Sequence, residues 1–232
     1  MLQIRRAADR GQTLVGWLDS RHSFSFGGYY DPENLGFRAL RVLNDDRVAP
    51  GAGFGTHGHR DMEILSYVLE GALEHEDSSG GGGVIRPGEI QFMRAGTGVT
   101  HSEYNHSAVE PVHFLQIWIV PSRTGLAPSY DQRSFDAARA EQSFALLASR
   151  DGRDGSIRLQ QDAELEVARI APGGSRERRL EPGRHAWVHV ARGAASLNGT
   201  LLDEGDAAAV SAEQSLKLAA ERPAEVLVFD LA

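Results

Sequence analysis

Residues 55–64 read GTHGHRDMEI, and residues 98–105 read GVTHSEYN. In each stretch, glycine precedes two side chains that can bind a metal ion and that are two residues apart. They are His57 and His59 in the first stretch, and His101 and Glu103 in the second. Residues i and i+2 of a β-strand point to the same face, about 7 Å apart along the chain. If both stretches are strands of one sheet, their side chains predict a single site with three imidazoles and one carboxylate.

These donor atoms suit a divalent first-row transition metal. We expect Fe2+, with Zn, Mn, Co, Ni and Cu as alternatives, because imidazole nitrogen and carboxylate oxygen accept all of them. Four protein ligands leave one or two positions open on an octahedral ion, as a catalytic or ligand-binding metal requires. A closed structural zinc site is usually rich in cysteine, and this chain has no cysteine. The pattern therefore predicts a metal that takes part in binding or chemistry.

The composition indicates a folded protein. The chain has 232 residues, of which 41% are hydrophobic and 24% are charged, and its formal net charge is −8. An acidic chain is a poor match for a phosphate backbone, so we expect no direct binding of nucleic acid. No apolar run is long enough for a transmembrane helix, so we expect no membrane association. The first residues also lack the apolar segment of a signal peptide, and we expect a cytoplasmic protein.

Strand signals dominate the chain and recur in two halves. Short runs of β-branched and aromatic residues alternate with Gly, Pro, Asn and Asp, which is typical of an all-β protein. In the first half VLEGALEHED is followed by RPGEIQFMRAG, and in the second VARGAASLNG is followed by DEGDAAAVSAE. This alignment matches Gly71 to Gly193 and Gly88 to Gly205. It predicts an internal repeat of two sandwiches or barrels.

A helical segment separates the halves. The Ala-rich run SFDAARAEQSFALL, residues 134–147, predicts a helix capped by its first serine. We therefore expect a metal-binding N-terminal barrel over residues 1–134, a helical linker over 135–152, and a C-terminal barrel without metal ligands over 153–232. The tract SSGGGG, residues 78–83, predicts a flexible surface loop at the tip of a hairpin.

Longer stretches of the sequence resemble the pirin family of the cupin superfamily. Residues 51–59 fit the first cupin motif, G-x5-H-x-H, and Glu63 and Gly71 continue it with one extra residue before the glycine. Residues 98–105 fit the end of the second cupin motif, although its usual proline is missing. The pirin-like stretches cover most of residues 15–121: GWLDSRHSFSFGGYYDP, LRVLNDDRV, GFGTHGHRDMEILSYVLEG, AGTGVTHSEYN and LQIWIVP.

The resemblance implies an all-β bicupin fold. Two jelly-roll β-barrels would lie face to face, joined by a short helix, with a metal in the N-terminal barrel alone. In pirins the ligands correspond here to His57, His59, His101 and Glu103, which is also the set that the strand argument predicts. Glu63, the glutamate of the first cupin motif, is then expected to support the ligands or to have a structural role.

The C-terminal half is expected to have lost its site. The repeat places Arg179 and Glu181 opposite the two histidines of the first motif, and Leu218 opposite the histidine of the second. Two histidines remain in this half, His185 and His189. They are four residues apart, which is too far for an H-x-H pair on a strand, and we interpret them as structural.

The other polar residues near the motifs are assigned ordinary positions. We expect His22, which alternates with phenylalanines, in the core or at the barrel mouth. His75 and His106 are expected at the surface. Arg60 and Asp61 could orient the ligand histidines by hydrogen bonds or form a surface ion pair.

The family resemblance also implies an activity. Pirins are known for quercetin 2,3-dioxygenase activity, in which O2 cleaves a flavonol ring and CO is released. A metal-dependent dioxygenase with a flavonoid-like substrate and O2 is therefore expected, with Glu103 as the ligand able to leave the metal and act as a catalytic base. A second possibility is a metal- or redox-dependent regulatory protein that binds a transcription or metabolic protein partner. A third is a cupin hydrolase or isomerase that uses Zn.

Overall fold

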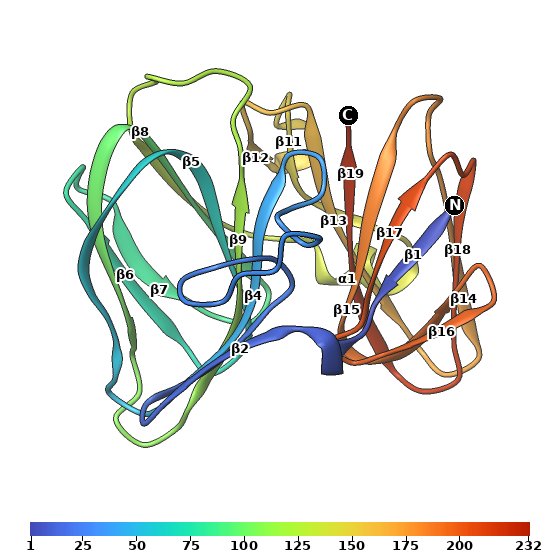
Figure 1. Cartoon of the computed structure of the whole chain (residues 1–232), viewed down its shortest axis with the longest axis horizontal. Coiled ribbons are helices and arrows are strands. Elements are labelled where there is room, and N and C mark those ends of the chain that lie inside the picture. Colours follow the sequence, from blue (N-terminus) through green and yellow to red (C-terminus); the bar gives the residue numbers. More distant parts are fainter. The chain divides into compact units, whose positions relative to one another are not determined.

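The computed structural model describes all 232 residues, and nearly all of its regular elements are β-strands (Figure 1). The chain divides into two compact units. The N-terminal unit comprises residues 11–134 and 159–161, and the C-terminal unit comprises residues 1–10, 135–158 and 162–232. Each unit contains one sheet system, so the all-β class predicted from the sequence is confirmed.

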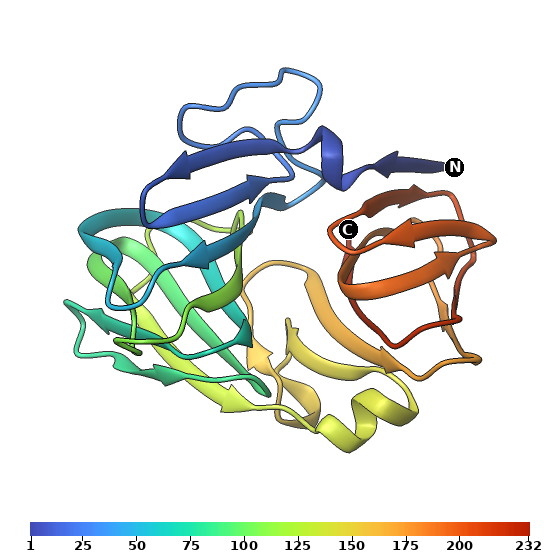
Figure 2. The same ribbon diagram turned by 90° about the horizontal axis from the view of Figure 1, so that it is seen from below.

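The N-terminal unit is an antiparallel sheet of nine strands in the order β2-β3-β4-β9-β5-β8-β6-β7, with β10 paired to β8. Its strands are β2 (Gly11–Val15), β3 (Leu18–His22), β4 (Leu40–Val48), β5 (Gly53–Glu70), β6 (Leu73–Asp77), β7 (Gly82–Ile85), β8 (Glu89–Asn105), β9 (Val112–Ile119) and β10 (Ser129–Ser134). Figure 2 shows the hairpin of β2 and β3, in dark blue, at the edge of this sheet. The long strands β5 and β8 pair with each other and carry the candidate metal ligands.

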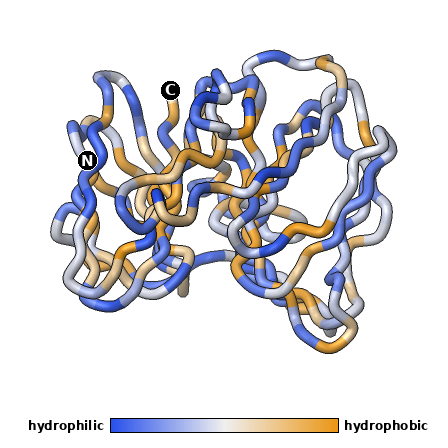
Figure 3. Tube along the Cα trace, turned by 180° about the vertical axis from the view of Figure 1, so that it is seen from behind, coloured by the Kyte–Doolittle hydropathy of each residue, from blue (hydrophilic) through white to orange (hydrophobic).

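The interior of the N-terminal unit has a polar layer between two apolar clusters. One cluster contains Val68 and Phe114, and the other contains Ile64. Ser66 lies on β5 between Ile64 and Val68, and it faces Gln116 on β9. This alternation of polar and apolar positions recurs along the chain as short blue and orange intervals (Figure 3). Because alternate strand residues share a face, buried polar groups here point into the same interior as the apolar clusters.

The C-terminal unit has ten strands, antiparallel except for the parallel pair of β11 and β12. They are β1 (Leu2–Arg5), β11 (Ala145–Ser149), β12 (Ile157–Arg158), β13 (Ala163–Ile170), β14 (Gly174–Arg179), β15 (His185–Leu197), β16 (Thr200–Asp203), β17 (Ala207–Ser211), β18 (Ser215–Ala220) and β19 (Ala224–Leu231). The helices α1 (Ala137–Gln142), η1 (Ala7–Asp9) and η2 (Arg153–Gly155) complete the unit. None of the helices is long and apolar enough to span a membrane.

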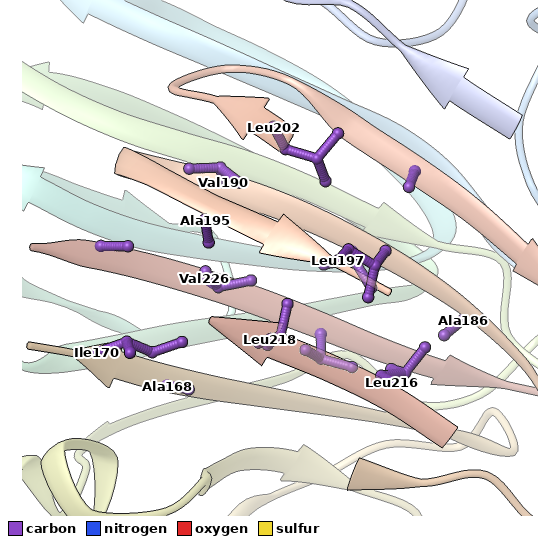
Figure 4. Close-up of a cluster of buried hydrophobic side chains, with 14 of the residues drawn as sticks. Ala168, Ile170, Ala186, Val190, Ala195, Leu197, Leu202, Leu216, Leu218 and Val226 are labelled. Carbon is purple, nitrogen blue, oxygen red and sulfur yellow. The ribbon is translucent and has the colours of Figure 1, made fainter. Parts of the chain in front are cut away.

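Small and branched apolar side chains fill the core of the C-terminal unit. Figure 4 shows Val190, Leu197, Leu218 and Val226 among them, contributed by β15, β18 and β19. All four are at most 1% exposed. This core is assembled without a central polar layer of the kind found in the N-terminal unit.

The internal repeat is visible in matching glycine turns. Gly71 and Gly193 have φ values of 74° and 72°, a region that favours glycine. A Cβ on Gly71 would lie 2.6 Å from the carbonyl oxygen of Pro111, and a Cβ on Gly193 would meet the carbonyl oxygen of Pro223. In both units a glycine thus crosses closely over the residue that precedes a core strand, β9 or β19, as the alignment of the two halves predicts.

The helix predicted over residues 134–147 is wrong in its bounds. The helix α1 covers only Ala137–Gln142, and Asp136 caps it by accepting a hydrogen bond from the backbone N–H of Arg139 at 2.9 Å. Ser134 ends β10 instead. The residues after the helix form β11, because Ala145 and Leu147 are buried against β13. Local helix propensity was outweighed there by sheet pairing with residues far along the chain.

The compact units also differ from the predicted domain bounds. Strand β1 pairs with β17, so residues 1–10 belong to the C-terminal unit rather than to the N-terminal barrel. Residues 135–152 are part of the C-terminal unit and do not form a separate linker. Residues 159–161 return to the N-terminal unit. The pairing partners of these short segments are distant in sequence, and strand periodicity alone does not identify them.

Candidate metal centre

Strands β5 and β8 bring the three predicted histidines together. His57 faces His101 across the strand pair, and their Nε2 atoms are 3.1 Å apart. The ring centroid of His59 lies 4.7 Å from that of His57 and 4.8 Å from that of His101. One ligand atom from each of the three lies within 4.8 Å of the others. The i, i+2 spacing in the first motif therefore places both imidazoles on one face.

The spacing of these nitrogens suits a single metal ion. An imidazole nitrogen binds a first-row ion at about 2.1 Å, so two adjacent ligands of an octahedral ion are about 3.0 Å apart. The distance between the Nε2 atoms of His57 and His101 matches this separation. The Nδ1 of His57 lies 2.9 Å from the carbonyl oxygen of Gly55. Because that oxygen can only accept, Nδ1 carries the proton and Nε2 keeps its lone pair for an ion.

Burial keeps His59 and His101 neutral. Burial, together with the nearby rings of His57 and His75, lowers the pKa of His101 to about 3. Burial likewise lowers the pKa of His59 to about 4, together with the rings of His101 and His57. Only a neutral imidazole can bind a metal. At neutral pH, protons therefore do not compete with a metal for His59 and His101.

Glu103 is held beside His101 by two hydrogen bonds. Its side chain is 3% exposed, and it follows His101 by two residues on β8. Ser66 Oγ donates to its Oε1 at 3.1 Å, and Gln116 Nε2 donates to its Oε2 at 2.7 Å. Glu103 shares a second cluster of potential ligand atoms, within 4.8 Å of one another, with His75 and His101. The polar layer of the interior thus fixes the carboxylate next to the histidines.

Aromatic side chains lie on one side of the histidine cluster. Trp118 packs edge-on against His59 with ring centroids 4.8 Å apart, and Phe26 packs edge-on against Trp118 at 5.4 Å. His22 lies 5.4 Å from Phe26 and is 1% exposed. Its Nδ1 is 2.8 Å from the Oδ1 of Asn44. The prediction of a packed core position for His22 is confirmed.

The prediction that His75 lies at the surface is wrong. Its side chain is 1% exposed, its Nδ1 lies 3.4 Å from the Nδ1 of His101, and its Nε2 lies 3.3 Å from the Oδ2 of Asp77. The glutamates on either side of it suggested exposure, but they take the opposite face of β6. The inward alternation of Leu73, His75 and Asp77 was the signal in the sequence. His106 is exposed, as predicted.

The carboxylates near the first motif do not reach the histidines. Asp61 accepts a hydrogen bond from the backbone N–H of Gly125 at 2.8 Å, so it holds a loop. Glu63 is fully buried and accepts hydrogen bonds from the backbone N–H groups of Gln160 and Gln161, at 2.7 and 3.0 Å. Burial raises the pKa of Glu63, against these two hydrogen bonds. Glu63 therefore has a structural role, which was one of the two roles expected for it.

No residue of the C-terminal unit belongs to either cluster of potential metal ligands. Arg179 and Glu181 are exposed and line a pocket of about 780 Å³. Leu218 lies in the apolar core. The Nδ1 of His185 contacts the hydroxyl of Ser211 at 2.7 Å.

The C-terminal unit contains a cluster of ion pairs around Arg178. The half-buried guanidinium of Arg178 contacts three carboxylates. They are Glu164 at 3.3 Å, Glu166 at 2.7 Å and Asp230 at 3.2 Å. Burial raises the pKa of Glu166, against the hydrogen bond and the charge of Arg178. Glu164 also pairs with Arg153 and Asp230 with Arg184, so Glu166 is the carboxylate that depends on Arg178 alone.

Two sheets related by an internal repeat, with a cluster of three histidines in the first and a buried glutamate beside one of them, define a protein with two cupin domains. Comparison with known proteins agrees with this class. Residues 3–119 match the family model described as Pirin, and residues 146–231 match the model described as the quercetinase C-terminal cupin domain. The chain belongs to the pirin family.

Named relatives are similar over their full length. A protein of Escherichia coli (strain K12) named quercetin 2,3-dioxygenase is 46% identical over 231 residues, covering 100% of this chain and 99% of the relative. A Mycobacterium bovis protein named putative quercetin 2,3-dioxygenase is 45% identical, covering 99% of this chain and 95% of the relative. The crystal structure of the bacterial pirin YhhW from Escherichia coli in complex with nickel(II) has a TM-score of 0.94 and 45% identity, covering 100% of this chain and 99% of that one.

Proposed function

We propose that the protein is a metal-dependent quercetin 2,3-dioxygenase, which cleaves a flavonol ring with O2 and releases CO. One observation carries the proposal: three histidines on β5 and β8 converge, with a buried glutamate beside them. Relatives that are 46% identical over the full chain carry this name, which supports the choice of reaction and substrate.

We assign the metal to the N-terminal unit, with four ligands. They are His57, His59, His101 and Glu103. The nickel(II) complex of the related pirin supports a divalent first-row ion. Fe2+ is the ion we propose, because histidine and carboxylate ligands with open positions are the usual setting of O2 chemistry in non-haem oxygenases. The reducing cytoplasm, where the sequence leads us to expect the protein, would keep iron in this state.

A bound divalent ion would polarise a substrate oxygen and lower the pKa of its hydroxyl group. The residues of the chain would receive the proton of that hydroxyl group. Glu103 accepts the proton of the flavonol hydroxyl at one carboxylate oxygen, as a general base. The donors on Ser66 and Gln116 hold that carboxylate in a fixed orientation, so that little reorganisation is needed when the proton moves.

The aromatic side chains position the substrate. A flavonol is planar and aromatic, and Trp118 and Phe26 offer ring edges and faces next to His59. Contacts between aromatic rings contribute about 0.5–1.5 kcal/mol beyond the area that they bury. The apolar cluster of Ile64 and Met93 lies on the same side of the polar layer as Trp118 and helps to exclude water.

A single substitution tests the proposed site. His101→Ala removes the central imidazole, and we expect loss of metal retention and of quercetin-dependent oxygen uptake. His106→Ala, an exposed histidine a few residues along the chain, should leave both unchanged. Full activity of the His101→Ala protein would contradict the proposal. Metal retention without quercetin-dependent uptake in the unaltered protein would instead favour a metal-dependent binding protein.

A further inference from the structure

A chain of buried polar groups runs from His101 to the tip of the β6–β7 hairpin. The Nδ1 of His101 lies 3.4 Å from the Nδ1 of His75, and the Nε2 of His75 lies 3.3 Å from the Oδ2 of Asp77. The side chains of His75 and Asp77 are 1% and 0% exposed. The strand pairing also places His75 opposite Glu103 and Asp77 opposite His101. These two residues take no part in the metal site proposed above, and their burial calls for a reason.

The hairpin tip fixes the carboxylate of Asp77. Its Oδ1 accepts hydrogen bonds from the backbone N–H and the hydroxyl of Ser79, at 2.8 and 2.6 Å, and from the backbone N–H of Gly81 at 3.0 Å. Burial acts to raise the pKa of Asp77, but the hydrogen bonds from Ser79, Gly81 and His75 outweigh it and the pKa is lowered. Asp77 is therefore ionised, and both of its oxygens only accept.

Close packing holds His75 in place. The ring of Tyr130 stacks on His75 with centroids 5.1 Å apart and an angle of 25° between the planes. A Cβ on Gly81 would lie 2.5 Å from both the Oδ2 of Asp77 and the Cβ of Tyr130. Gly81, within the surface loop predicted over residues 78–83, therefore has no room for a side chain. The loop packs closely against Asp77 and Tyr130, behind the proposed metal site.

The directions of the hydrogen bonds follow from the fixed acceptor. Because Asp77 only accepts, the Nε2 of His75 must carry a proton, and the Nδ1 of a neutral His75 then has a lone pair. That lone pair can only accept, so the Nδ1 of His101 must donate. The Nε2 of a neutral His101 is then left with its lone pair, directed at the Nε2 of His57.

We infer that Asp77 and His75 are positioning residues that set the tautomer of His101, so that its Nε2 is kept ready for a metal ion. The inference rests on the proposed metal site and adds two residues to it. Hydrogen-bond partners behind metal-ligating histidines typically change metal affinity by about 10- to 100-fold when they are removed. Here the partner is a second imidazole, and the anion that orients it is supplied by a serine- and glycine-rich turn.

Asp77→Asn is the informative substitution. Three donors of the turn point at the position of Oδ1, so the oxygen of the new amide must occupy that position and accept from them. Its NH2 group then faces the Nε2 of His75 and donates to it. His75 would carry its proton on Nδ1, His101 would have to accept at Nδ1, and its own proton would move to Nε2. The change reverses the chain of hydrogen bonds, blocks the ligand atom, and leaves the turn intact.

Two measurements test the inference, and neither needs catalysis. The first is the affinity for Ni(II) at pH 8, measured by competition with a chelator. We expect Asp77→Asn to weaken it by about 10- to 100-fold. The second is the 15N NMR spectrum of the imidazoles in metal-free protein at pH 8. We expect the His101 proton on Nδ1 in the unaltered protein and on Nε2 in the Asp77→Asn protein. His106→Ala is the control and should change neither.

A double variant separates orientation from charge or folding. In a His75→Leu background the hydrogen bonds between Asp77 and His101 are already interrupted. Adding Asp77→Asn should then have no further effect on Ni(II) affinity. The inference would be overturned if Asp77→Asn weakened Ni(II) affinity by the same factor in both backgrounds. An unchanged His101 tautomer in the single variant would also overturn it. A protein that binds Ni(II) but consumes no O2 with quercetin would refute the proposed activity and leave this test valid. Failure to bind Ni(II) would refute the metal site, while the NMR result would still decide the tautomer.

Discussion

Asp46 on β4 is a buried carboxyl group whose replacement by Asn should change how stability depends on pH. Its side chain is 3% exposed, and its Oδ1 has no hydrogen-bond partner. Burial raises its pKa from 3.8 to about 7; Asp45 and Glu103 add to the shift, and a hydrogen bond with Ser20 opposes it. Asp46 is therefore protonated in the folded protein at pH values where it is ionised in the unfolded chain.

The sign and the size of the effect follow from these two pKa values. The folded value lies above the unfolded value, so the contribution to stability is complete below about pH 4 and is lost as the pH rises to about 7. A difference of about 3 units corresponds to about 4 kcal/mol at 1.36 kcal/mol per unit. Between pH 5 and pH 8, the free energy of unfolding should fall by roughly 2.5 kcal/mol because of this one group.

Urea unfolding at pH 5 and pH 8 measures this quantity. Asp46→Asn removes the titration, so the variant should gain roughly 2.5 kcal/mol relative to the unaltered protein on going from pH 5 to pH 8. The buried amide changes the free energy of unfolding equally at both pH values, so its effect cancels in the difference between them. Asp19→Asn, at a partly exposed position on the neighbouring strand, is the control. Parallel stability curves for the Asp46→Asn and unaltered proteins would show that Asp46 does not titrate between pH 5 and pH 8.

Three further substitutions probe the site and the scaffold. Gln116→Leu removes one of the two donors to Glu103 and should weaken metal binding by roughly 10- to 150-fold, since a hydrogen bond to a charged group contributes about 1.5–3 kcal/mol; unchanged Ni(II) affinity would argue against a role for that contact. Trp118→Leu should raise KM for quercetin by about 2- to 12-fold from lost ring contacts and leave Ni(II) affinity unaltered, whereas an equal loss of both would mean that Trp118 supports the metal site. Arg178→Met leaves the buried Glu166 without its partner and should lower the free energy of unfolding by about 3 kcal/mol, whereas Glu164 keeps Arg153 and Asp230 keeps Arg184. The exposed Arg222→Met control should lose less than about 1 kcal/mol; equal losses in urea unfolding would contradict this prediction.

Much of the site could be predicted because it is built from strand periodicity. The i, i+2 spacing of His57 and His59, and of His101 and Glu103, needs only a strand to bring each pair to one face. The pairing of β5 with β8 then brings the faces together. The repeat could be predicted for a similar reason, since Gly71 and Gly193 meet the same steric demand in each half.

The rest depends on partners that are distant in sequence. The charged neighbours of His75 suggested exposure, but its burial is decided by the pairing of β6 with β8 and by Tyr130 on β10. The segment from Ala145 to Ser149 has helix-forming residues, yet pairing with β13 makes it a strand. Strand β1 joins β17, about two hundred residues later. No local pattern specifies these choices, because cross-strand contacts stabilise them.

Oxygen uptake by anaerobically prepared, Fe(II)-loaded protein, with and without quercetin, tests the proposed dioxygenase activity most directly. We expect uptake that requires both the metal and quercetin, with release of one CO for each O2 consumed. We also expect His101→Ala to abolish the uptake. No quercetin-dependent uptake from protein shown to contain its metal would rule out the proposed dioxygenase and would assign the histidine cluster to binding rather than to catalysis.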